Sequence, residues 1–185
     1  HAQRRPWDFG CSAVSSGPGS FTGIRIGVAA VKGMAFTHDV PCVGVSTLEA
    51  IAWSGMALDG LICSVMDARR QQVYNANFTF DGDTMIRLCE DRAISIEELT
   101  DELKKENRIV YLAGDGAALC YEAMRGELTD VRLVPEHFRY ARGFGVAMAA
   151  MKELREHGTV SHEQLVPTYL RPSQAEREKM NLKRG

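Results

Sequence analysis

Residues 17–23 have the composition of a phosphate-binding loop. They read Gly-Pro-Gly-Ser-Phe-Thr-Gly, between an apolar segment and a helical pattern. A Walker A loop requires Gly-x4-Gly-Lys-Ser/Thr, but no lysine occurs between Gly17 and Lys32. A dinucleotide-binding loop requires Gly-x-Gly-x-x-Gly, and here the last glycine comes one residue late. The spacing therefore favours a structural turn, and weak anion binding by Gly17, Gly19 and Ser20 at a helix N-terminus is the open alternative.

Acidic side chains and histidines give a second set of candidates for chemistry. Asp67 ends an apolar segment and could ligate magnesium in a phosphate-binding hairpin. However, Arg69 and Arg70 occupy the turn, where the close approach of a phosphate usually requires glycine. We therefore interpret Asp67 and Arg69 as a turn cap and ion pair. Because the chain contains no His-x3-His pair, no metal site is predicted.

Composition narrows the class of protein. Of the 185 residues, 45% are hydrophobic and 25% are charged, and the net charge is −2. These values are typical of a soluble globular protein and indicate no surface that coats nucleic acid. No apolar run reaches the roughly 18 residues that a membrane span needs. The five cysteines include no Cys-x-x-Cys pair, which indicates free thiols in a reducing compartment. We therefore expect a cytoplasmic protein.

Strand and helix patterns alternate along the chain, which predicts an α/β fold. The expected strands cover residues 9–16, 42–45, 61–66, 72–80, 84–89, 109–113 and 131–134. The expected helices cover residues 22–37, 46–55, 95–106, 117–124 and 142–157. Capping boxes, Ser46 with Glu49 and Ser95 with Glu98, mark two helix starts. Gly158 is expected to end the last helix in a left-handed conformation.

The order of elements also repeats. A strand, a glycine turn, a helix and a strand surround Gly17, and the same order returns around Gly114. The second unit has three further strands and a helix before its glycine turn, for which the first unit has no room. We therefore expect two duplicated lobes, with the first lacking its N-terminal strands and helix. Their predicted bounds are residues 1–58 and 59–164, followed by an extended tail at 165–185.

The helix predicted at residues 22–37 carries an unusual number of small residues. Its small-residue face comprises Gly23, Gly27, Ala30 and Met34, next to an apolar face of Ile24, Val28, Val31 and Ala35. Each glycine inside a helix costs roughly 1 kcal/mol relative to alanine, so a compensating contact is expected. Either the helix packs closely on its own sheet, or a helix of a partner chain approaches the small-residue face. The residue pattern alone leaves both explanations open.

Four segments together resemble the bacterial TsaB (YeaZ) family. They are Gly17-Pro-Gly-Ser-Phe-Thr-Gly-Ile-Arg-Ile-Gly27, Val43-Gly-Val-Ser-Thr-Leu-Glu-Ala50, Met66-Asp-Ala-Arg-Arg-Gln-Gln-Val-Tyr74 and Pro167-Thr-Tyr-Leu-Arg-Pro172. They follow the same order as in the family and extend over nearly the whole chain. The resemblance implies a duplicated actin-like fold, the Hsp70-like ATPase (ribonuclease H-like) architecture, in agreement with the repeat.

The resemblance also implies a function in forming threonylcarbamoyladenosine on tRNAs that read codons beginning with adenine. Members of the family are non-catalytic scaffold subunits that pair with the paralogous transferase TsaD, and the ATPase TsaE joins the complex. ATP and metal are then expected in the partner subunits, and tRNA is bound through the complex. The chain alone is expected to bind no cofactor and to have no activity. The metal-binding His-x3-His of the catalytic paralogue has no counterpart here.

Pairing in the family uses the first two helices of the first lobe, and the second of these corresponds to residues 22–37. The resemblance therefore favours the partner-helix explanation, with a homodimer as a second mode of pairing. The expected interface residues are Gly23, Arg25, Gly27, Ala30 and Met34. Two alternative functions are known on the same fold, that of an M22-type metallopeptidase homologue and that of a sugar-kinase-like ATPase. Stoichiometric metal would support the first alternative, and tight ATP binding by the isolated chain would support the second.

Overall fold

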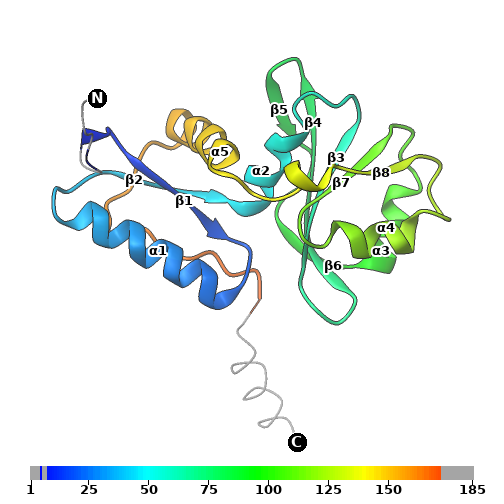
Figure 1. The fold of residues 1–185 in the computed structure, drawn as a ribbon, viewed down its shortest axis with the longest axis horizontal. Helices are drawn as coiled ribbons and strands as arrows, with labels where there is room; N and C mark the ends of the chain where they lie inside the picture. The colour runs from blue at the N-terminus through cyan, green and yellow to red at the C-terminus, as the bar shows by residue number, and fades with distance from the viewer. Residues whose placement is uncertain (1–4, 6–7, 172–185) are drawn as a thin grey trace, which may run out of the picture.

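Two β-sheets, each with its own helices, form two lobes in the computed structural model (Figure 1). The structure describes residue 5 and residues 8–171. Predictions that concern residues 1–4, 6–7 and 172–185, including the ends of the first lobe and of the tail, lie outside the described residues.

The first lobe contains two parallel strands and one long helix. Strand β1 (Ser12–Gly17) pairs with β2 (Cys42–Ser46), and helix α1 (Phe21–Phe36) connects them. The helix begins where the Ser20 hydroxyl accepts a hydrogen bond from the amide of Gly23, at 3.3 Å. The apolar face expected for this helix is confirmed, since Ile24, Val28, Val31 and Ala35 are buried. They pack with Val40, Cys42 and Leu165 into the core of this lobe.

The second lobe is built on a six-stranded mixed sheet. Its strands lie in the order β5-β4-β3-β7-β8, with β6 paired to β4. Their bounds are β3 (Leu61–Asp67), β4 (Gln72–Asp81), β5 (Thr84–Arg87), β6 (Arg92–Ser95), β7 (Val110–Ala113) and β8 (Val131–Leu133). Helices α3 (Ile96–Leu103) and α4 (Ala117–Met124) supply core residues on one side of this sheet, including Leu99, Cys120 and Met124.

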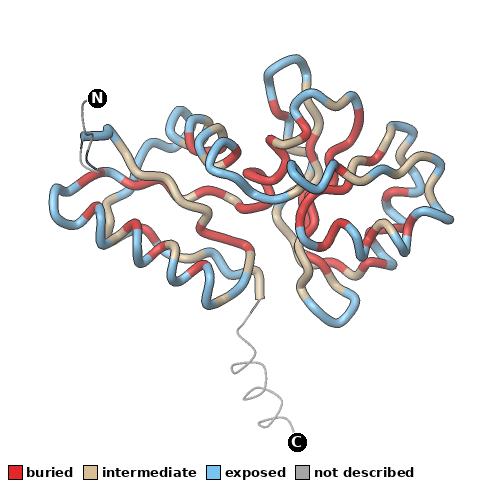
Figure 2. The backbone as a smooth tube through the Cα atoms, in the orientation of Figure 1, coloured by how far each residue is buried: buried red, intermediate tan, exposed pale blue. Residues whose placement is uncertain are grey.

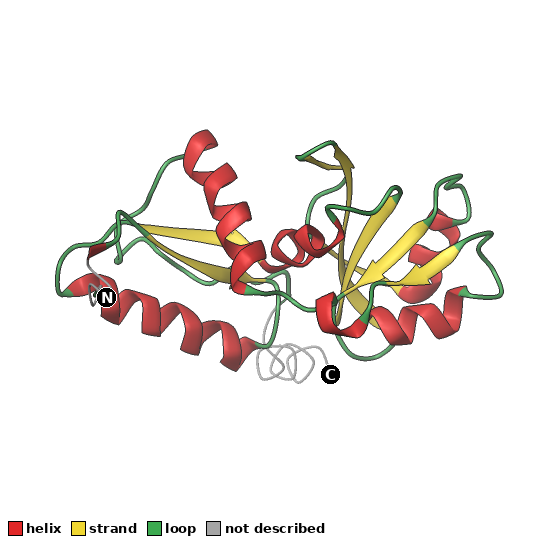
Figure 3. Ribbon diagram, turned by 45° about the horizontal axis from the view of Figure 1, so that its top comes forward, coloured by secondary structure: helices red, strands yellow, loops and turns green. Residues whose placement is uncertain are grey.

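Four helical segments connect the two sheets (Figure 3). They are α2 (Thr47–Ala52), η2 (Trp53–Gly55), η3 (Glu136–Phe138) and α5 (Gly143–Glu156). A shared core joins strands of both sheets to α2, η2 and α5, and the buried parts of the chain concentrate there (Figure 2). Gly145 brings α5 against α2, because a Cβ atom at this position would lie 2.0 Å from the carbonyl oxygen of Ala50.

The expected repeat is visible in the order of elements. Strand β1, helix α1 and strand β2 follow one another in the first lobe, as β7, α4 and β8 do in the second. Gly17 and Gly114, which begin the connecting turns, both have positive φ values, of 142° and 108°. At both positions a Cβ atom would overlap a backbone carbonyl oxygen, that of Thr168 or that of Val65. Both turns therefore depend on glycine for the same steric reason.

Most predicted elements are confirmed, with two differences. Strand β6 was not expected from the sequence, which assigned no structure to residues 92–94 and placed Ser95 at the start of a helix. The capping box at Ser95 and Glu98 is present, and Gly158 is left-handed with φ of 83°. At the box predicted for Ser46 and Glu49, Ser46 does cap α2. The Glu49 side chain, however, accepts a hydrogen bond from Arg87 and not from the Ser46 amide. The box prediction was therefore wrong for its glutamate half.

Candidate functional site: the exposed face of helix α1 and the adjacent cleft

Helix α1 exposes the face on which the sequence places the partner interface. Gly23, Arg25, Ala30 and Met34 are exposed, and Gly27 is half-buried (Figure 2). Gly23, Gly27, Ala30 and Met34 share one side of this helix, adjacent to the side that packs on β1 and β2. Arg25 lies on the other flank, toward the C-terminal segment. Participation of the five predicted residues in an interface stays a prediction.

Close packing on the sheet does not explain the glycines of this helix. A Cβ atom at Gly33 would meet nothing within 4 Å, and one at Gly23 would meet only the capping Ser20. At Gly27 the nearest atom is Val14 Cγ2 at 3.7 Å, an ordinary van der Waals distance. The first of the two explanations from sequence is therefore wrong, since alanine would fit at these positions without displacing a neighbour.

Large apolar side chains extend this exposed face. Ile26 is 65% exposed, Met34 47% and Phe36 71%. Sequence reasoning missed Ile26 and Phe36, although apolar residues on both faces of a helix are a signal for a second packing surface. Phe36 lies on the flank of Arg25 and Lys32, where its ring contacts that of His162 with centroids 5.4 Å apart. We call Gly23, Ile26, Gly27, Ala30, Gly33 and Met34 the α1 face.

The C-terminal segment lies along the other flank of α1. Arg25 Nε donates to the hydroxyl of Tyr169 at 2.8 Å, and its guanidinium lies 3.9 Å from the ring centroid of Phe21. Lys32 Nζ donates to the carbonyl oxygens of Glu163 and Leu165, each at 3.2 Å. Arg25 is therefore already bonded within the chain, which fixes its position at the edge of the α1 face.

A cleft of about 400 Å³ opens at the N-terminus of α1, where the sequence places the weak anion loop. Gly19 and Ser20 line it, together with the β3–β4 turn and the C-terminal segment. Gly17 is buried beneath that segment, and the amide of Thr168 donates to the carbonyl of Ser16 at 2.7 Å. The Ser20 hydroxyl is engaged as the helix cap. Anion binding at this loop stays a prediction.

Two carboxylates face the same cleft, and both have structural partners. Asp67 accepts a hydrogen bond from the amide of Arg69 at 2.7 Å and pairs with its guanidinium at 3.2 Å. Asp115 accepts from the amide of Asp67 at 3.2 Å. The interpretation of Asp67 and Arg69 as a turn cap and ion pair is confirmed. Arg69, Arg70 and Gln71 all have positive φ values in this turn.

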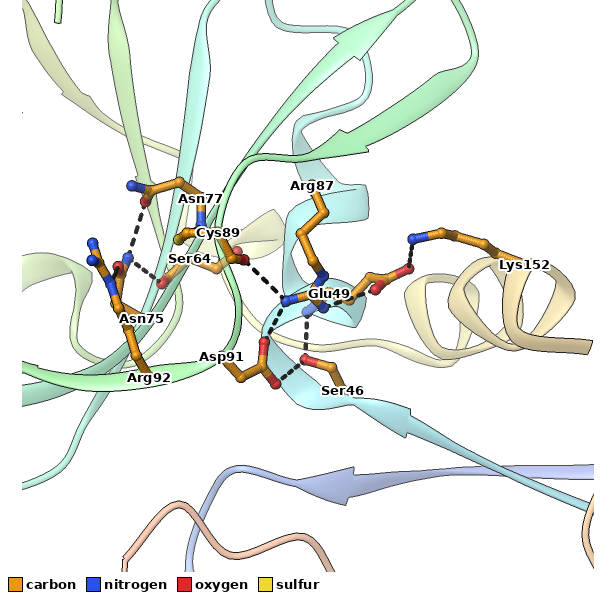
Figure 4. Close-up of polar contacts among 10 residues, drawn as sticks. All are labelled: Ser46, Glu49, Ser64, Asn75, Asn77, Arg87, Cys89, Asp91, Arg92 and Lys152. Atoms are coloured by element: carbon orange, nitrogen blue, oxygen red, sulfur yellow. Dashed lines mark hydrogen bonds and ion pairs between the residues drawn. The ribbon is translucent and has the colours of Figure 1, made fainter. Parts of the chain in front are cut away.

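A buried charge network that sequence reasoning missed connects the lobes (Figure 4). Arg87 of β5 donates to Glu49 of α2 at 2.8 Å and to Asp91 at 2.6 Å. Lys152 of α5 approaches Glu49 at 3.4 Å, and Ser46 donates to Asp91 at 2.6 Å. Burial disfavours the charge on Arg87, but its hydrogen bonds to Asp91 and Glu49 outweigh burial and raise the pKa of the guanidinium.

A second polar cluster lies beside this network in the middle of the six-stranded sheet (Figure 4). The fully buried Asn75 donates to the carbonyl of Ser64 at 3.2 Å and to Asn77 at 3.0 Å. Arg92 Nε donates to the Asn75 side-chain oxygen at 3.1 Å. These bonds satisfy an amide that would otherwise be costly to bury.

Residue 5 and residues 8–171 contain neither a cluster of metal-ligand side chains nor a membrane-length apolar helix. No three His, Cys, Asp or Glu side chains in this part of the chain lie close enough together to share a metal ion. None of its helices has the length and apolarity that crossing a membrane requires.

Comparison with known proteins connects this geometry to a family. The sequence model described as "TsaD: tRNA N6-adenosine threonylcarbamoyltransferase" matches residues 2–179. A protein from Pseudomonas aeruginosa, described as similar to peptidase YeaZ, superposes with a TM-score of 0.70 at 20% identity. The superposition covers 90% of this chain and 76% of that one. This likeness shows the fold, a partial actin-like, ribonuclease H-like architecture.

Curated relatives agree with the structural match. The "tRNA threonylcarbamoyladenosine biosynthesis protein TsaB" of Bacillus subtilis is 31% identical over 174 residues, which are 92% of this chain and 73% of that relative. The protein of the same name from Haemophilus influenzae is 27% identical, over 86% of this chain and 69% of the relative. The Escherichia coli protein is 34% identical over 51% of this chain and 42% of its own length. The match to a family model over nearly all residues, and the identity to TsaB proteins, show that the chain belongs to the TsaB (YeaZ) family.

Proposed function

We propose that this chain is a non-catalytic scaffold subunit of the complex that forms threonylcarbamoyladenosine on tRNA. Its relatives carry the name of that biosynthesis, and the family model that it matches describes the transferase TsaD. The proposal assigns the transfer step, the metal and ATP to partner subunits, TsaD and TsaE. This chain then has no activity alone and acts in the cytoplasm on tRNA that the complex binds.

The observation that carries the proposal is the α1 face. Three glycines weaken this helix. At Gly23 and Gly33, no neighbouring element lies close enough to exclude a side chain. Beside them, Ile26 is 65% and Met34 47% exposed. A helix that is apolar on both sides has a second partner to cover it. Small residues let that partner be another helix at a short interaxial distance.

A paralogue of the same fold is the partner that suits this surface. The chain matches the TsaD family model over residues 2–179, so a TsaD subunit is expected to have a helix equivalent to α1. Packing of two such helices would bury Ile26 and Met34 together with the glycines beside them. A homodimer through the same face would compete with TsaD, because both use the same residues.

A matched pair of substitutions tests the proposal. Ala30 on α1 and Ala118 on α4 are both exposed alanines within helices, so leucine at either position leaves the folded chain intact. Ala30→Leu should abolish co-elution with TsaD in size-exclusion chromatography, because an added isobutyl group overpacks a close helix seam. Ala118→Leu should co-elute normally.

Activity provides the second readout. TsaD, TsaE and ATP are incubated with an unmodified tRNA, and the modified nucleoside is measured by mass spectrometry with and without this chain. Modification should depend on the chain, persist with Ala118→Leu and disappear with Ala30→Leu. Undiminished binding of TsaD by Ala30→Leu would overturn the assigned interface, and modification without the chain would overturn the scaffold function.

A further inference from the structure

An aromatic cavity lies at the N-terminus of α5, away from the α1 face and the cleft. Its volume is about 250 Å³. The residues that line it come from α2, η2, η3 and the start of α5: Ala50, Trp53, Ser54, Met56, Phe138, Tyr140, Arg142, Phe144 and Gly145. Figures 1 and 3 show these elements together between the two sheets. Pockets for drug-sized ligands usually measure about 300–1,000 Å³, so this cavity suits a single planar ring system.

The aromatic residues of this cavity are unusually accessible. Phe138 is 55% exposed, Tyr140 46% and Phe144 55%. Two backbone contacts fix the segments that carry these residues. Gly145 packs on the backbone of Ala50, and the carbonyl of Arg139 accepts a hydrogen bond from the amide of Gly114 at 2.7 Å. Rigid, exposed aromatic faces are platforms on which a nucleobase can stack.

One charged side chain, Arg142, occurs among the described residues that line the cavity. Its guanidinium lies 5.5 Å from the ring centroid of Phe138, and the acidic Glu136 of η3 is not part of the lining. Arg142 is also the N-cap of the 14-residue helix α5. The first turn of this helix has no side-chain cap and contains no acidic residue. The positive end of the helix dipole and its uncapped amides therefore face this region, and both favour a phosphate group.

One buried donor in the cavity wall has no partner. Trp53 is 5% exposed, and among the described residues its indole N–H has no hydrogen-bond partner. A buried polar group is normally satisfied by protein, water or ligand. The nitrogen atom itself is buried, and Trp53 also lines a neighbouring pocket with Met85 and Met148. We therefore assign the indole to the wall of the cavity and not to a hydrogen bond with a base.

We infer that this cavity binds an unpaired nucleotide of an RNA strand. The base stacks among Phe138, Tyr140 and Phe144, and the adjoining phosphate lies against Arg142 and the first turn of α5. Sequence-specific recognition of RNA commonly relies on such unstacked bases held by aromatic side chains and arginine. The inference rests on the proposed function, since a tRNA-modifying complex brings RNA to the chain, and it adds a direct RNA contact made by this subunit.

The test measures the affinity of the assembled complex with TsaD for an unmodified tRNA transcript. Phe144→Ala should weaken binding roughly 5- to 150-fold, the range for loss of one stacked base. Arg142→Ala should weaken binding through loss of a phosphate contact. Phe9→Ala and Arg125→Ala are the matched controls, because Phe9 is 51% exposed and the Arg125 side chain 61% exposed at sites outside the cavity. Arg142→Ala should also reduce the slope of log affinity against log salt by about one.

Fluorescence locates the contact. The chain has two tryptophans, so Trp7→Phe leaves Trp53 as its single emitter, with TsaD tryptophans replaced or subtracted. Binding of tRNA should quench Trp53 emission, and Phe144→Ala should remove the quenching. Tyr140→Ala provides a second variant with the same expectation.

The outcomes separate this inference from the proposed function. If the wild-type complex assembles and modifies tRNA while the Phe144 and Arg142 variants bind tRNA as tightly as wild type, the RNA site is overturned and the scaffold function stands. If these variants instead lose TsaD, the cavity is a protein-docking site and the RNA assignment is likewise overturned. If the wild-type chain neither binds TsaD nor supports modification, the proposed function falls, and the inference falls with it.

Discussion

Arg87 and Glu49 join the two lobes through a charged hydrogen bond of 2.8 Å between β5 and α2. Their side chains are only 19% and 11% exposed, and Asp91 shares the guanidinium at 2.6 Å. Two carboxylates thus share one arginine where little solvent reaches them. Among the described residues, removing the arginine leaves Glu49 with only Lys152 at 3.4 Å and Asp91 with only the Ser46 hydroxyl at 2.6 Å, which is a weaker compensation for buried charge.

Substitution of Arg87 tests this dependence. Arg87→Ala should lower the free energy of unfolding by about 1–3 kcal/mol, because Glu49 and Asp91 would lose the charged hydrogen bonds of their shared partner. Urea denaturation followed by circular dichroism measures the change. The exposed pair of Arg125 and Glu122, with side chains 61% and 63% exposed, provides the control. Arg125→Ala should change stability by less than about 1 kcal/mol, and an equal loss in both variants would contradict the assigned importance of the buried network.

A substitution at Gly33 can separate the effect of the α1 face on the stability of the chain from its effect on binding to TsaD. A Cβ atom there would meet nothing within 4 Å, so Gly33→Ala should stabilise the isolated chain by about 0.5–1 kcal/mol through helix propensity. If a partner helix approaches this face, the same methyl group should weaken the complex with TsaD. Thermal melting and isothermal titration calorimetry measure the two effects. A variant that is more stable and binds TsaD more tightly would contradict the helix seam.

Features that depend on neighbouring residues in the chain could be predicted from the sequence. The start of α1 follows from the Ser20 cap and from a 3.6-residue apolar period, both of which are local. The buried face of α1 and the exposed predicted interface follow from the same periodicity. Strand β6 could not be predicted, because its four residues become a strand only by pairing with β4.

Features that depend on distant residues could not be predicted in this way. The sequence assigned Glu49 to a local capping box, whereas its carboxylate binds Arg87 and Lys152, which belong to other elements. The cavity beside Trp53 combines η2 with the start of α5, and only the packing of Gly145 on Ala50 brings them together. Local propensity carries no information on such pairings.

Cysteine reactivity is expected to differ between sites. Burial raises the pKa of the Cys120 thiol to about 12 and raises the pKa of Cys63 well above its ordinary value. Since the thiolate is the reactive form, iodoacetamide at pH 8 should leave both unmodified in the folded protein. Cys11 and Cys89, which are partly accessible, should react first. Peptide mapping by mass spectrometry measures the order, and early labelling of Cys63 would contradict it.

Glu98 should contribute to acid sensitivity. Hydrogen bonds from the Ser95 side chain and backbone lower the pKa of Glu98 from 4.5. A carboxyl whose folded-state pKa lies below its unfolded-state value stabilises the fold above the unfolded value, and that contribution is lost as the pH falls through the folded value. Unfolding free energies measured from pH 6 down to pH 3 should therefore fall less steeply in Glu98→Gln than in wild type. Equal slopes would show that Glu98 does not contribute to the pH dependence of the unfolding free energy.

The two glycine turns should respond differently to the same substitution. At Gly114, with φ of 108°, a Cβ atom would lie 2.0 Å from the carbonyl oxygen of Val65, inside the six-stranded sheet. Gly114→Ala should therefore disrupt cooperative folding of the second lobe. At Gly17, with φ of 142°, the overlapping atom is the carbonyl oxygen of Thr168 at 2.1 Å, in the C-terminal segment.

Leu165 anchors that segment in the core of the first lobe, but Thr168 and Tyr169 are held by individual contacts and can move away while both sheets stay folded. Gly17→Ala should break the bond from the Thr168 amide to Ser16 and release the stack of Tyr169 on Phe21, whose ring centroids lie 4.8 Å apart. Hydrogen exchange should then accelerate at Thr168 and Tyr169 but not in β3 or β7. Gly126→Ala, where a Cβ atom meets nothing within 4 Å, should leave exchange unchanged throughout. Faster exchange across β3 in the Gly17 variant would instead mean that the first turn supports the second lobe, and that the two lobes fold as one unit.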